Sequence, residues 1–258
     1  MTSVHVIKIG GNVIDRADVL QHVLDDVAKI DEPFILVHGG GALATQLNTQ
    51  LGIPTTMVDG RRITDADTLR TVTMVYAGLI NKSIVASLQA RACNAIGLCG
   101  ADANIVRATK RGTAERDYGF VGDVVAVNIE ALQALLQQVR CVVIAPITHD
   151  GSGQLLNTNA DTMAAEIAAA MSAVARVRLT YVFDHPGVML SMDDPASVIE
   201  ELHVAHIEEL ATSGIITKGM LPKIHNAVRA ATAGVDVRIC GPSDLHTTAG
   251  TRIRIDHV

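Results

Sequence analysis

The sequence predicts an α/β protein with a mainly parallel central sheet, and three observations lead to this fold class. Short apolar runs alternate along the chain with longer segments of helical period, which is typical of βα units. Two of the apolar runs end in glycine clusters, as strands do where they turn towards a helix. The 258 residues are 48% hydrophobic and 19% charged, so the chain holds enough apolar material for a sizeable core and is not disordered.

Apolar runs predict the strands of this sheet, and segments of helical period lie between them. The strands are expected at 4–9, 34–37, 95–99, 141–145, 178–183 and 235–240. The helices are expected at 17–29, 42–51, 66–91, 129–138, 161–174, 206–213 and 222–233. Two segments break the alternation: 104–127 predicts two short strands around a basic turn, and 148–155 predicts a hairpin. We expect one continuous sheet in a single domain, residues 1–258, with a weak lobe boundary near residue 175.

Polar residues and glycines at the expected helix ends support these limits. The expected N-caps are Thr64, in a capping box with Asp67, and Asn128 and Asn159. The expected C-caps are Gly214 and Gly234.

Composition argues against several classes of partner. The net charge of −6 repels nucleic acid and anionic membranes, and the chain has no Trp and only 2% aromatic residues for stacking bases. The four cysteines form no C-x-x-C pair, so we expect them to be reduced and without a metal cluster. No uninterrupted apolar run reaches the roughly 18 residues of a membrane span, and no signal-peptide pattern precedes the first strand. These features predict a cytoplasmic protein without nucleic-acid or membrane partners.

Two strand ends carry groups suited to binding an anion. Lys8-Ile9-Gly10-Gly11 places a cation in an apolar strand, where it is costly unless it is paired or lies at the strand's end. His38-Gly39-Gly40-Gly41 leads into a helix, whose first N–H groups are free to bind an anion. A snorkelling lysine and plain tight turns are the structural alternatives. Neither segment is a Walker loop or a Rossmann fingerprint.

Three further segments carry charged groups at helix starts. Arg61 and Arg62 precede a helix and suit a two-pronged grip on a carboxylate, although adjacent arginines also occur on plain surfaces. Asp161 lies in the first turn of a helix, where the helix dipole alone explains an acid. Lys223 follows Pro222 in a first turn, where a cation opposes the dipole at a penalty of about 0.3 to 1 kcal/mol. A residue that opposes the local electrostatic preference in this way points to a functional role.

In this order, the five segments resemble motifs of the amino-acid kinase family, in particular of its N-acetylglutamate kinases of arginine biosynthesis. The resemblance runs from Lys8 to the Gly250-Thr251-Arg252-Ile253 segment, nearly the whole chain. It implies a three-layer α/β/α sandwich in which lobe 1–175 binds the amino-acid substrate and forms a homodimer, and lobe 176–258 binds ATP. It also implies phosphorylation of the γ-carboxylate of N-acetyl-L-glutamate.

The resemblance assigns roles to individual residues. Lys8 and Lys223 would stabilise the transferring phosphoryl group, and Asp161 would hold the two ammonium groups in place. The residues expected to bind the substrate are Gly40, Gly41, Arg62 and Asn157. The residues expected to bind ATP are Gly10, Gly11, Thr180, Tyr181, Ile216 and Thr217. We expect Mg²⁺ to arrive with ATP, and no residue is assigned as a metal ligand.

The chemistry of this reaction needs no catalytic histidine. A side-chain carboxylate with a pKa near ~4.3 is already an anion at neutral pH and requires no general base. We therefore interpret His38, His149 and His225 as structural. The difficulty is the charge on the phosphoryl oxygens, which the lysines would stabilise. If one such donor contributes about 2.7 to 4 kcal/mol, losing either lysine should lower the rate by about two to three orders of magnitude.

Several alternatives remain open at this point. Relatives usually have Leu-[Ser/Thr]-Asp-Val-x-Gly where this chain has Tyr181 and two additional residues before Gly187. This departure indicates a divergent branch, and N-succinyl-L-glutamate is an alternative substrate. Carbamate, glutamate 5- and uridylate kinases share the implied fold, and an inactive regulatory protein on it is the alternative of another class. Since the first strand begins at Val4 without the additional N-terminal helix of arginine-inhibited relatives, we expect no arginine feedback.

Overall fold

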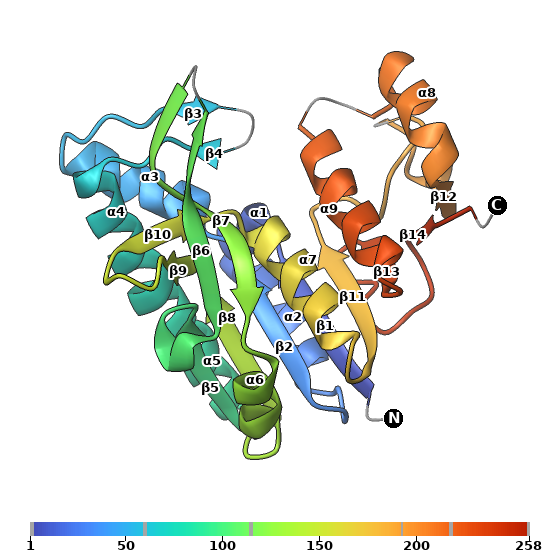
Figure 1. The fold of residues 1–258 in the computed structure, drawn as a ribbon. Helices are drawn as coiled ribbons and strands as arrows, with labels where there is room; N and C mark the ends of the chain where they lie inside the picture. The colour runs from blue at the N-terminus through green and yellow to red at the C-terminus, as the bar shows by residue number, and fades with distance from the viewer. Residues whose placement is uncertain (1–2, 59–60, 114–115, 192, 217–218, 257–258) are drawn as a thin grey trace.

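An eight-stranded sheet forms the centre of the molecule. The computed structural model describes residues 3–58, 61–113, 116–191, 193–216 and 219–256 (Figure 1). The strands are β1 (Ser3–Ile9), β2 (Phe34–His38), β5 (Ala95–Cys99), β8 (Cys141–Ala145), β11 (Arg176–Val182), β12 (Glu201–His203), β13 (Asp236–Cys240) and β14 (Thr251–Arg254). Their order is β12-β14-β13-β11-β1-β2-β8-β5. Neighbouring strands are parallel except β13 and β14, so the predicted parallel sheet is confirmed.

Helices cover both faces of this sheet and make three layers. On the face seen in Figure 1 lie α6 (Ile129–Leu136), α7 (Ala160–Met171) and α9 (Leu221–Thr232), with α8 (Ile207–Thr212) at the edge. Behind the sheet lie α1 (Gly11–Ile14), α2 (Ala17–Val27), α3 (Gly41–Gln50) and α5 (Asn81–Gln89). Each face has its own apolar core, because alternate residues of a strand point to opposite faces. In β1, for example, Val6 belongs to the core under α7 and Ile7 to the core behind the sheet.

The remaining strands form separate small sheets, so the expectation of one continuous sheet was wrong. Strands β6 (Val106–Thr113), β7 (Arg116–Val127), β9 (Ile147–His149) and β10 (Leu155–Thr158) close into a small barrel, and β3 (Met57–Val58) pairs with β4 (Arg61–Arg62). Pro146 separates β8 from β9 and has no N–H group to continue the ladder of the large sheet. The predicted strands within 104–127 and the hairpin at 148–155 are confirmed and supply this barrel.

Most of the expected helix caps are present. Asn128 and Asn159 accept backbone N–H bonds from Ala131 and Thr162, at 3.1 and 2.9 Å. The capping box at Thr64 was wrong: Asp65 caps α4 (Ala66–Thr73), and its carboxylate accepts the N–H of Thr68. The two glycine caps are confirmed, since Gly214 and Gly234 have φ values of 78° and 83°.

The predicted helix 66–91 is one continuous rod with a π-helical middle. It consists of α4, a π-helical segment at Met74–Ile80 and α5. By length and mean hydropathy alone, Ala66–Gln89 could cross a membrane, which the sequence analysis did not anticipate. In this structure 44% of its most apolar window is buried, and Val72, Ile80 and Ile84 belong to the core behind the sheet.

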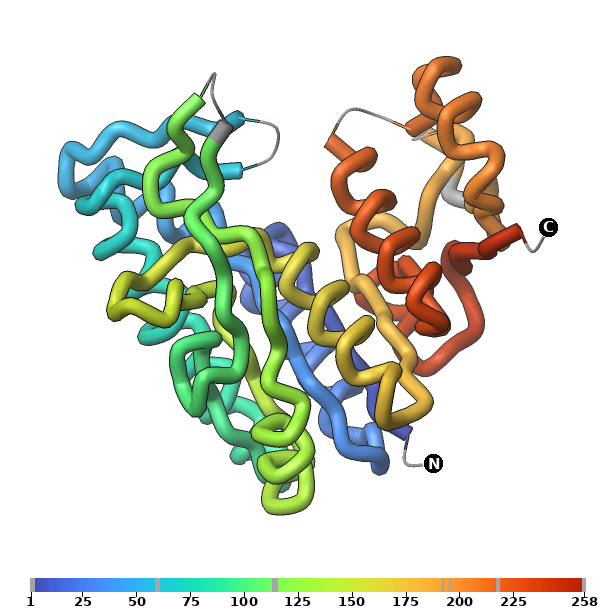
Figure 2. Tube along the Cα trace, in the orientation of Figure 1, coloured from blue at the N-terminus to red at the C-terminus, as the bar shows by residue number. Residues whose placement is uncertain are grey.

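The middle and the last part of the chain lie on opposite sides of the molecule. In Figure 2 the segments from α3 to the barrel lie on one side, and α8, α9, β13 and β14 lie on the other. Strand β1 pairs with β2 on one side and β11 on the other, and Lys8 lies opposite Val37 and Tyr181. Residues from distant parts of the sequence therefore meet where β1 ends.

Candidate active site

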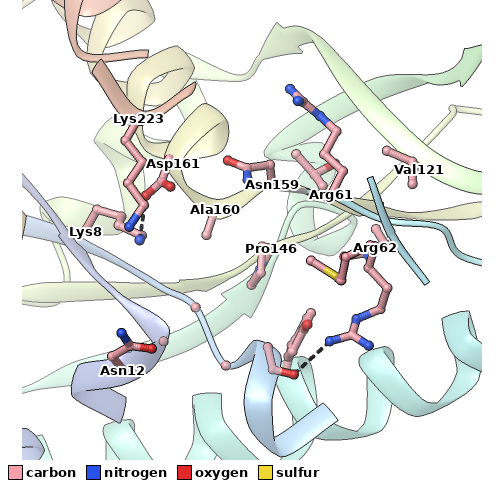
Figure 3. A pocket seen from close by; sticks show the side chains of 18 residues that line it. Lys8, Asn12, Arg61, Arg62, Val121, Pro146, Asn159, Ala160, Asp161 and Lys223 are labelled. Atoms are coloured by element: carbon pink, nitrogen blue, oxygen red, sulfur yellow. Dashed lines mark hydrogen bonds and ion pairs between the residues drawn. The ribbon is translucent and has the colours of Figure 1, made fainter. Parts of the chain in front are cut away.

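A cavity lies at the carboxyl ends of the central strands. Its floor is formed where β1, β2 and β11 end. Gly39 N–H donates to Ile9 O at 3.0 Å and joins the ends of β2 and β1, and Gly10 N–H donates to Val182 O at 3.0 Å and joins the ends of β1 and β11. The cavity has a volume of about 390 Å³, which suits a small-molecule ligand. Its lining includes Lys8, Gly11, Gly39, Gly40, Gly41, Arg61, Arg62, Tyr76, Asn157, Thr158, Asn159, Asp161 and Lys223 (Figure 3).

The glycine segments give this cavity a wall of backbone groups. Gly40 has a φ of 140°, and a Cβ atom there would lie 2.1 Å from Cδ1 of Ile80, so only glycine fits. Directly after it, α3 begins at Gly41 without a side-chain cap. The first N–H groups of α3 are consequently free of intrahelical partners beside the cavity, where they can bind an anion.

Lys8 and Asp161 form a buried ion pair in the cavity. Lys8 Nζ lies 2.5 Å from Asp161 Oδ1, and the side chains are only 5% and 10% exposed. Asp161 comes from the first turn of α7, which Asn159 caps. Although Oδ1 is in ionic contact with Lys8, it accepts no aligned hydrogen bond from the described residues. The pair compensates the cost of burying either charge alone.

Lys223 approaches the same acid from the first turn of α9. Figure 3 shows its ammonium group beside the Lys8–Asp161 pair. Burial lowers the pKa of Lys223; Asp161 opposes this shift and the neighbouring Lys8 adds to it. Two cations and one acid thus meet in the cavity, from β1, α7 and α9.

Arg62 lies at the other end of the cavity and is held by polar groups. Its guanidinium donates hydrogen bonds to Gly41 O at 2.8 Å, to Thr45 Oγ1 at 2.7 Å and to Thr55 Oγ1 at 3.2 Å. The side chain is buried, and its Nε has no hydrogen-bond partner among the described residues. A buried guanidinium in the wall of a cavity is suited to a carboxylate ligand.

Asn157 connects the barrel to the Arg62 segment. Its amide donates to Thr64 Oγ1 at 3.0 Å, and that hydroxyl donates to Arg62 O at 2.7 Å. Thr64 is also held by the barrel: its N–H bonds to Tyr118 O and its carbonyl accepts from Phe120 N–H. Asn157, Thr64 and Arg62 therefore form one connected unit.

The structure brings most of the predicted site residues together, but not all of those assigned to ATP. Gly10 lies next to the cavity: a Cβ atom added to it would lie 3.8 Å from Lys8 Nζ. Thr180 points to the opposite face of the sheet, where its hydroxyl lies 2.8 Å from His5 Nε2. Tyr181 is buried under α7, and its hydroxyl donates to Asp161 O at 3.1 Å. Ile216 is buried near α8, and Thr217 lies outside the described residues. The ATP contacts of these residues stay predictions.

Asn12 and Asn159 are among the lining residues that were not anticipated from the sequence. Asn12 lines the cavity and donates to Asp184 Oδ2 at 2.8 Å, which joins the start of α1 to the segment after β11. Asn159 lines the cavity in addition to capping α7. The position of Asn12 directly after the two glycines was the available signal.

The structure gives hydrogen-bond partners for two of the histidines that were expected to be structural, His38 and His149. His38 is fully buried, its Nδ1–H donates to Gly39 O at 2.9 Å, and burial lowers its pKa to about 4. His149 Nε2 lies 2.8 Å from Asn104 Oδ1, away from the cavity.

The side chains that commonly hold metal ions are dispersed in the part of the chain that the structure describes. Within the described ranges, no three His, Cys, Asp or Glu side chains gather closely enough to hold a metal ion. Asp161 is the acid in the cavity lining, and it is paired with Lys8.

Comparison with known proteins identifies the family. A family model described as the amino acid kinase family matches residues 3–241. The chain belongs to the amino acid kinase family. Among curated family members, the acetylglutamate kinase of Bacteroides fragilis is 50% identical and the match covers 96% of each chain. The acetylglutamate kinase of Cytophaga hutchinsonii is also 50% identical, over 98% of this chain and 99% of that protein.

Solved structures confirm the amino acid kinase fold. The N-acetylglutamate synthase of Neisseria gonorrhoeae, complexed with coenzyme A and N-acetyl-glutamate, superposes with a TM-score of 0.84 at 22% identity, over 99% of this chain and 60% of that one. Carbamate kinase of Giardia lamblia bound to AMP-PNP superposes with a TM-score of 0.70 at 15% identity, over 99% of each chain. The three-layer sandwich expected from the motifs is thereby confirmed.

Proposed function

We propose that this chain catalyses the ATP-dependent phosphorylation of the γ-carboxylate of N-acetyl-L-glutamate, a step of arginine biosynthesis. The observation that carries the proposal is the meeting of Lys8, Lys223 and Asp161 in one cavity with a glycine wall and Arg62. The full-length relatives named acetylglutamate kinase, at 50% identity, support this substrate.

Each part of the cavity has a task in such a reaction. Arg62 binds the α-carboxylate of the substrate, and Asn157 binds a neighbouring group. A γ-carboxylate oxygen attacks the terminal phosphorus of ATP; the new P–O bond forms as the bond to the ADP oxygen breaks, which leaves an acyl phosphate and ADP. The Lys8 and Lys223 ammonium groups and the N–H groups at Gly40 and Gly41 neutralise the charge of the transferring group.

Asp161 allows the two lysine ammonium groups to lie close together during this reaction. Two like charges side by side repel each other, and a carboxylate between them offsets this repulsion. No proton has to be removed from the nucleophile, because a carboxylate is ionised at neutral pH. The buried, neutral His38 is therefore not needed as a general base, and its role is structural.

The nucleotide is proposed to contact residues from both halves of the chain. Gly10 and Gly11 are proposed to approach the ATP phosphates, and residues 176–258 to form the nucleotide-binding lobe, with residues 1–175 as the substrate lobe. Mg²⁺ would be bound mainly by phosphate oxygens and water, as it often is in kinases.

N-succinyl-L-glutamate is a second candidate substrate, and one feature of the cavity favours it. Arg61 lines the cavity together with Arg62, and both lie apart from the two lysines. A succinyl group carries one more carboxylate than an acetyl group, and a second arginine is suited to it.

Both candidates are tested by one assay. The measurement is kcat/KM for N-acetyl- against N-succinyl-L-glutamate, with the acyl phosphate trapped by hydroxylamine. Higher kcat/KM for one substrate decides between them, and inactivity on both contradicts the proposal.

Lys8→Ala is expected to lower kcat by about two to three orders of magnitude while the chain remains folded. A folded, fully active Lys8→Ala protein would contradict the role of the lysine.

We also propose that the protein is a homodimer and acts in the cytoplasm. Met74 and Leu79, on the outer side of the long helical rod, are 49% and 59% exposed, which supports an interface there. Light scattering after gel filtration should give twice the monomer mass of 27.2 kDa. Leu79→Lys should shift the protein to monomer, and a wild-type monomer at all concentrations contradicts the proposal.

A further inference from the structure

Both lysines of the cavity lie over the same aromatic ring. Lys223 Nζ is 4.0 Å from the centroid of the Phe183 ring, and Lys8 Nζ is 4.9 Å from it. Phe183 follows β11 directly and is only 3% exposed. Both distances lie within the roughly 6 Å at which a ring face attracts a cation.

The ring is fixed in place by its neighbours. It stacks on Tyr181 with centroids 5.8 Å apart and planes at 23°. Its backbone N–H bonds to Cys240 O at 3.0 Å, and a Cβ on Gly10 would lie 3.3 Å from its Cδ1 atom. Since the Tyr181 hydroxyl donates to Asp161 O, the ring, the acid and the lysines are parts of one packed unit.

Lys223 shares the carboxylate of Asp161 with Lys8. Asp161 makes its 2.5 Å ion pair with Lys8, while Lys223 faces the ring more closely than Lys8 does. The charged groups that act on Lys223 are Asp161 and Asp184, which favour its charged form, and Lys8, which disfavours it. Burial also disfavours the charged form.

A ring is suited to this position for an electrostatic reason. A carboxylate in place of the ring would add negative charge to that of Asp161 and Asp184, and would repel the phosphates and the substrate carboxylate that enter the cavity. An aromatic face attracts the ammonium group through its quadrupole but carries no net charge. It can therefore stabilise the cation without repelling the anionic ligands.

We propose that Phe183 is a positioning residue whose ring face holds the Lys223 ammonium, and more weakly that of Lys8, charged and aimed at the transferring phosphoryl group. The inference rests on the proposed phosphoryl transfer for its effect on rate. Its effect on the charge of Lys223 does not depend on the identity of the substrate.

Phenylalanines with one, two and three ring fluorines at position 183 provide the first test. Fluorination weakens the ring quadrupole with little change in shape. The logarithm of kcat should fall steadily with the number of fluorines, to about tenfold below wild type for the trifluoro ring, while KM for the acylglutamate changes little. A kcat that does not change across the series overturns the proposal.

Phe183→Leu provides the second test, with a readout that needs no substrate. The pKa of Lys223 is measured by NMR on labelled lysine in the wild type and the variant. Losing the ring should lower this pKa, because the charged form loses its partner, and the alkaline limb of the kcat profile should move to lower pH. Phe34→Leu is the matched control, since Phe34 is a fully buried ring in the core behind the sheet. It should lower stability without moving the Lys223 pKa.

The outcomes separate this inference from the proposed function. If the wild type phosphorylates an acylglutamate but neither the fluorinated series nor the Lys223 pKa responds, the role of Phe183 is wrong. If the pKa responds but the wild type phosphorylates neither acylglutamate, the ring holds the lysine and the proposed function is wrong. Should Phe183→Leu fail to fold, the fluorinated series decides, because its rings keep the volume of the native side chain.

Discussion

At the scale of single residues, the most consequential contact is the ion pair of Lys8 and Asp161. Both side chains are nearly inaccessible to solvent, so each charge depends on the other to be tolerated in the interior. The same carboxylate also offsets the repulsion between Lys8 and Lys223. Stability and catalysis consequently depend on one acid.

Asp161→Asn should therefore lower both properties. Breaking a buried ion pair by removing one partner costs about 3 to 5 kcal/mol of unfolding free energy, and we expect that loss in urea denaturation. The double variant Lys8→Met/Asp161→Asn should recover much of the stability, since no unpaired charge is left, but no activity. An Asp161→Asn protein as stable as wild type would show that the pair is not buried in solution.

A second residue-scale prediction concerns stability at acid pH. Burial, with Arg178 and Arg238, lowers the pKa of His5 from 6.5 to about 3 in the folded protein. The unfolded chain therefore binds a proton that the folded one does not between these values. Stability contributed by the neutral His5 is complete above pH 6.5 and is lost as the pH falls towards 3.

His5→Gln should make the free energy of unfolding less steep between pH 6.5 and pH 3, measured by urea denaturation at several pH values. Equal slopes for wild type and His5→Gln would contradict the assignment.

At the scale of elements, the turn before α3 is the most restrictive feature. Gly40→Ala forces a Cβ into Ile80 at a φ that alanine avoids, so we expect loss of both stability and activity. The matched control is Gly78→Ala in the π-helical segment, where a Cβ meets nothing within 4 Å. That change should be neutral or stabilising by up to about 1 kcal/mol in thermal unfolding. The idea fails if the two variants behave alike.

Two helix caps allow a comparison between a structural and a functional helix start. Asn128→Ala and Asn159→Ala each remove a cap that accepts one N–H bond, with an expected loss of about 1 kcal/mol. Only Asn159→Ala should also lower kcat, because the first turn of α7 carries Asp161. Unfolding curves and initial rates measure both effects, and an equal loss of kcat in the two variants would argue against this distinction.

At the scale of the whole molecule, the cavity links segments from both halves of the chain. A ligand that binds only the folded protein stabilises it by mass action, by about 2.7 kcal/mol at 100 times its Kd. N-acetyl-L-glutamate or its succinyl counterpart should therefore raise Tm in the absence of ATP.

Arg62→Lys should largely abolish this rise in Tm, since lysine lacks the planar fork that bonds Gly41 O and Thr45 and can also grip a carboxylate. Differential scanning calorimetry with and without ligand measures the shift. An unchanged shift in the variant means that the substrate carboxylate binds elsewhere.

The local patterns of the chain were sufficient for its main elements and for much of the site. Strands at 95–99 and 141–145 and the caps Asn128 and Asn159 could be predicted because spacing and capping chemistry act within a few residues. The glycine and lysine motifs were visible for the same reason, since each is a short segment with its own conformational demand.

Contacts between distant segments were decided only by the folded chain. No local pattern in 178–183 says that Thr180 faces His5 while Tyr181 supports Asp161, or that Phe183 lies under two lysines. The closure of the barrel likewise depends on pairing the β6–β7 hairpin with the β9–β10 hairpin, which α6 and β8 separate in the sequence. Periodicity determines which residues can share a face, whereas the register between β1 and β11 and the packing of α7 and α9 determine which charges and rings meet.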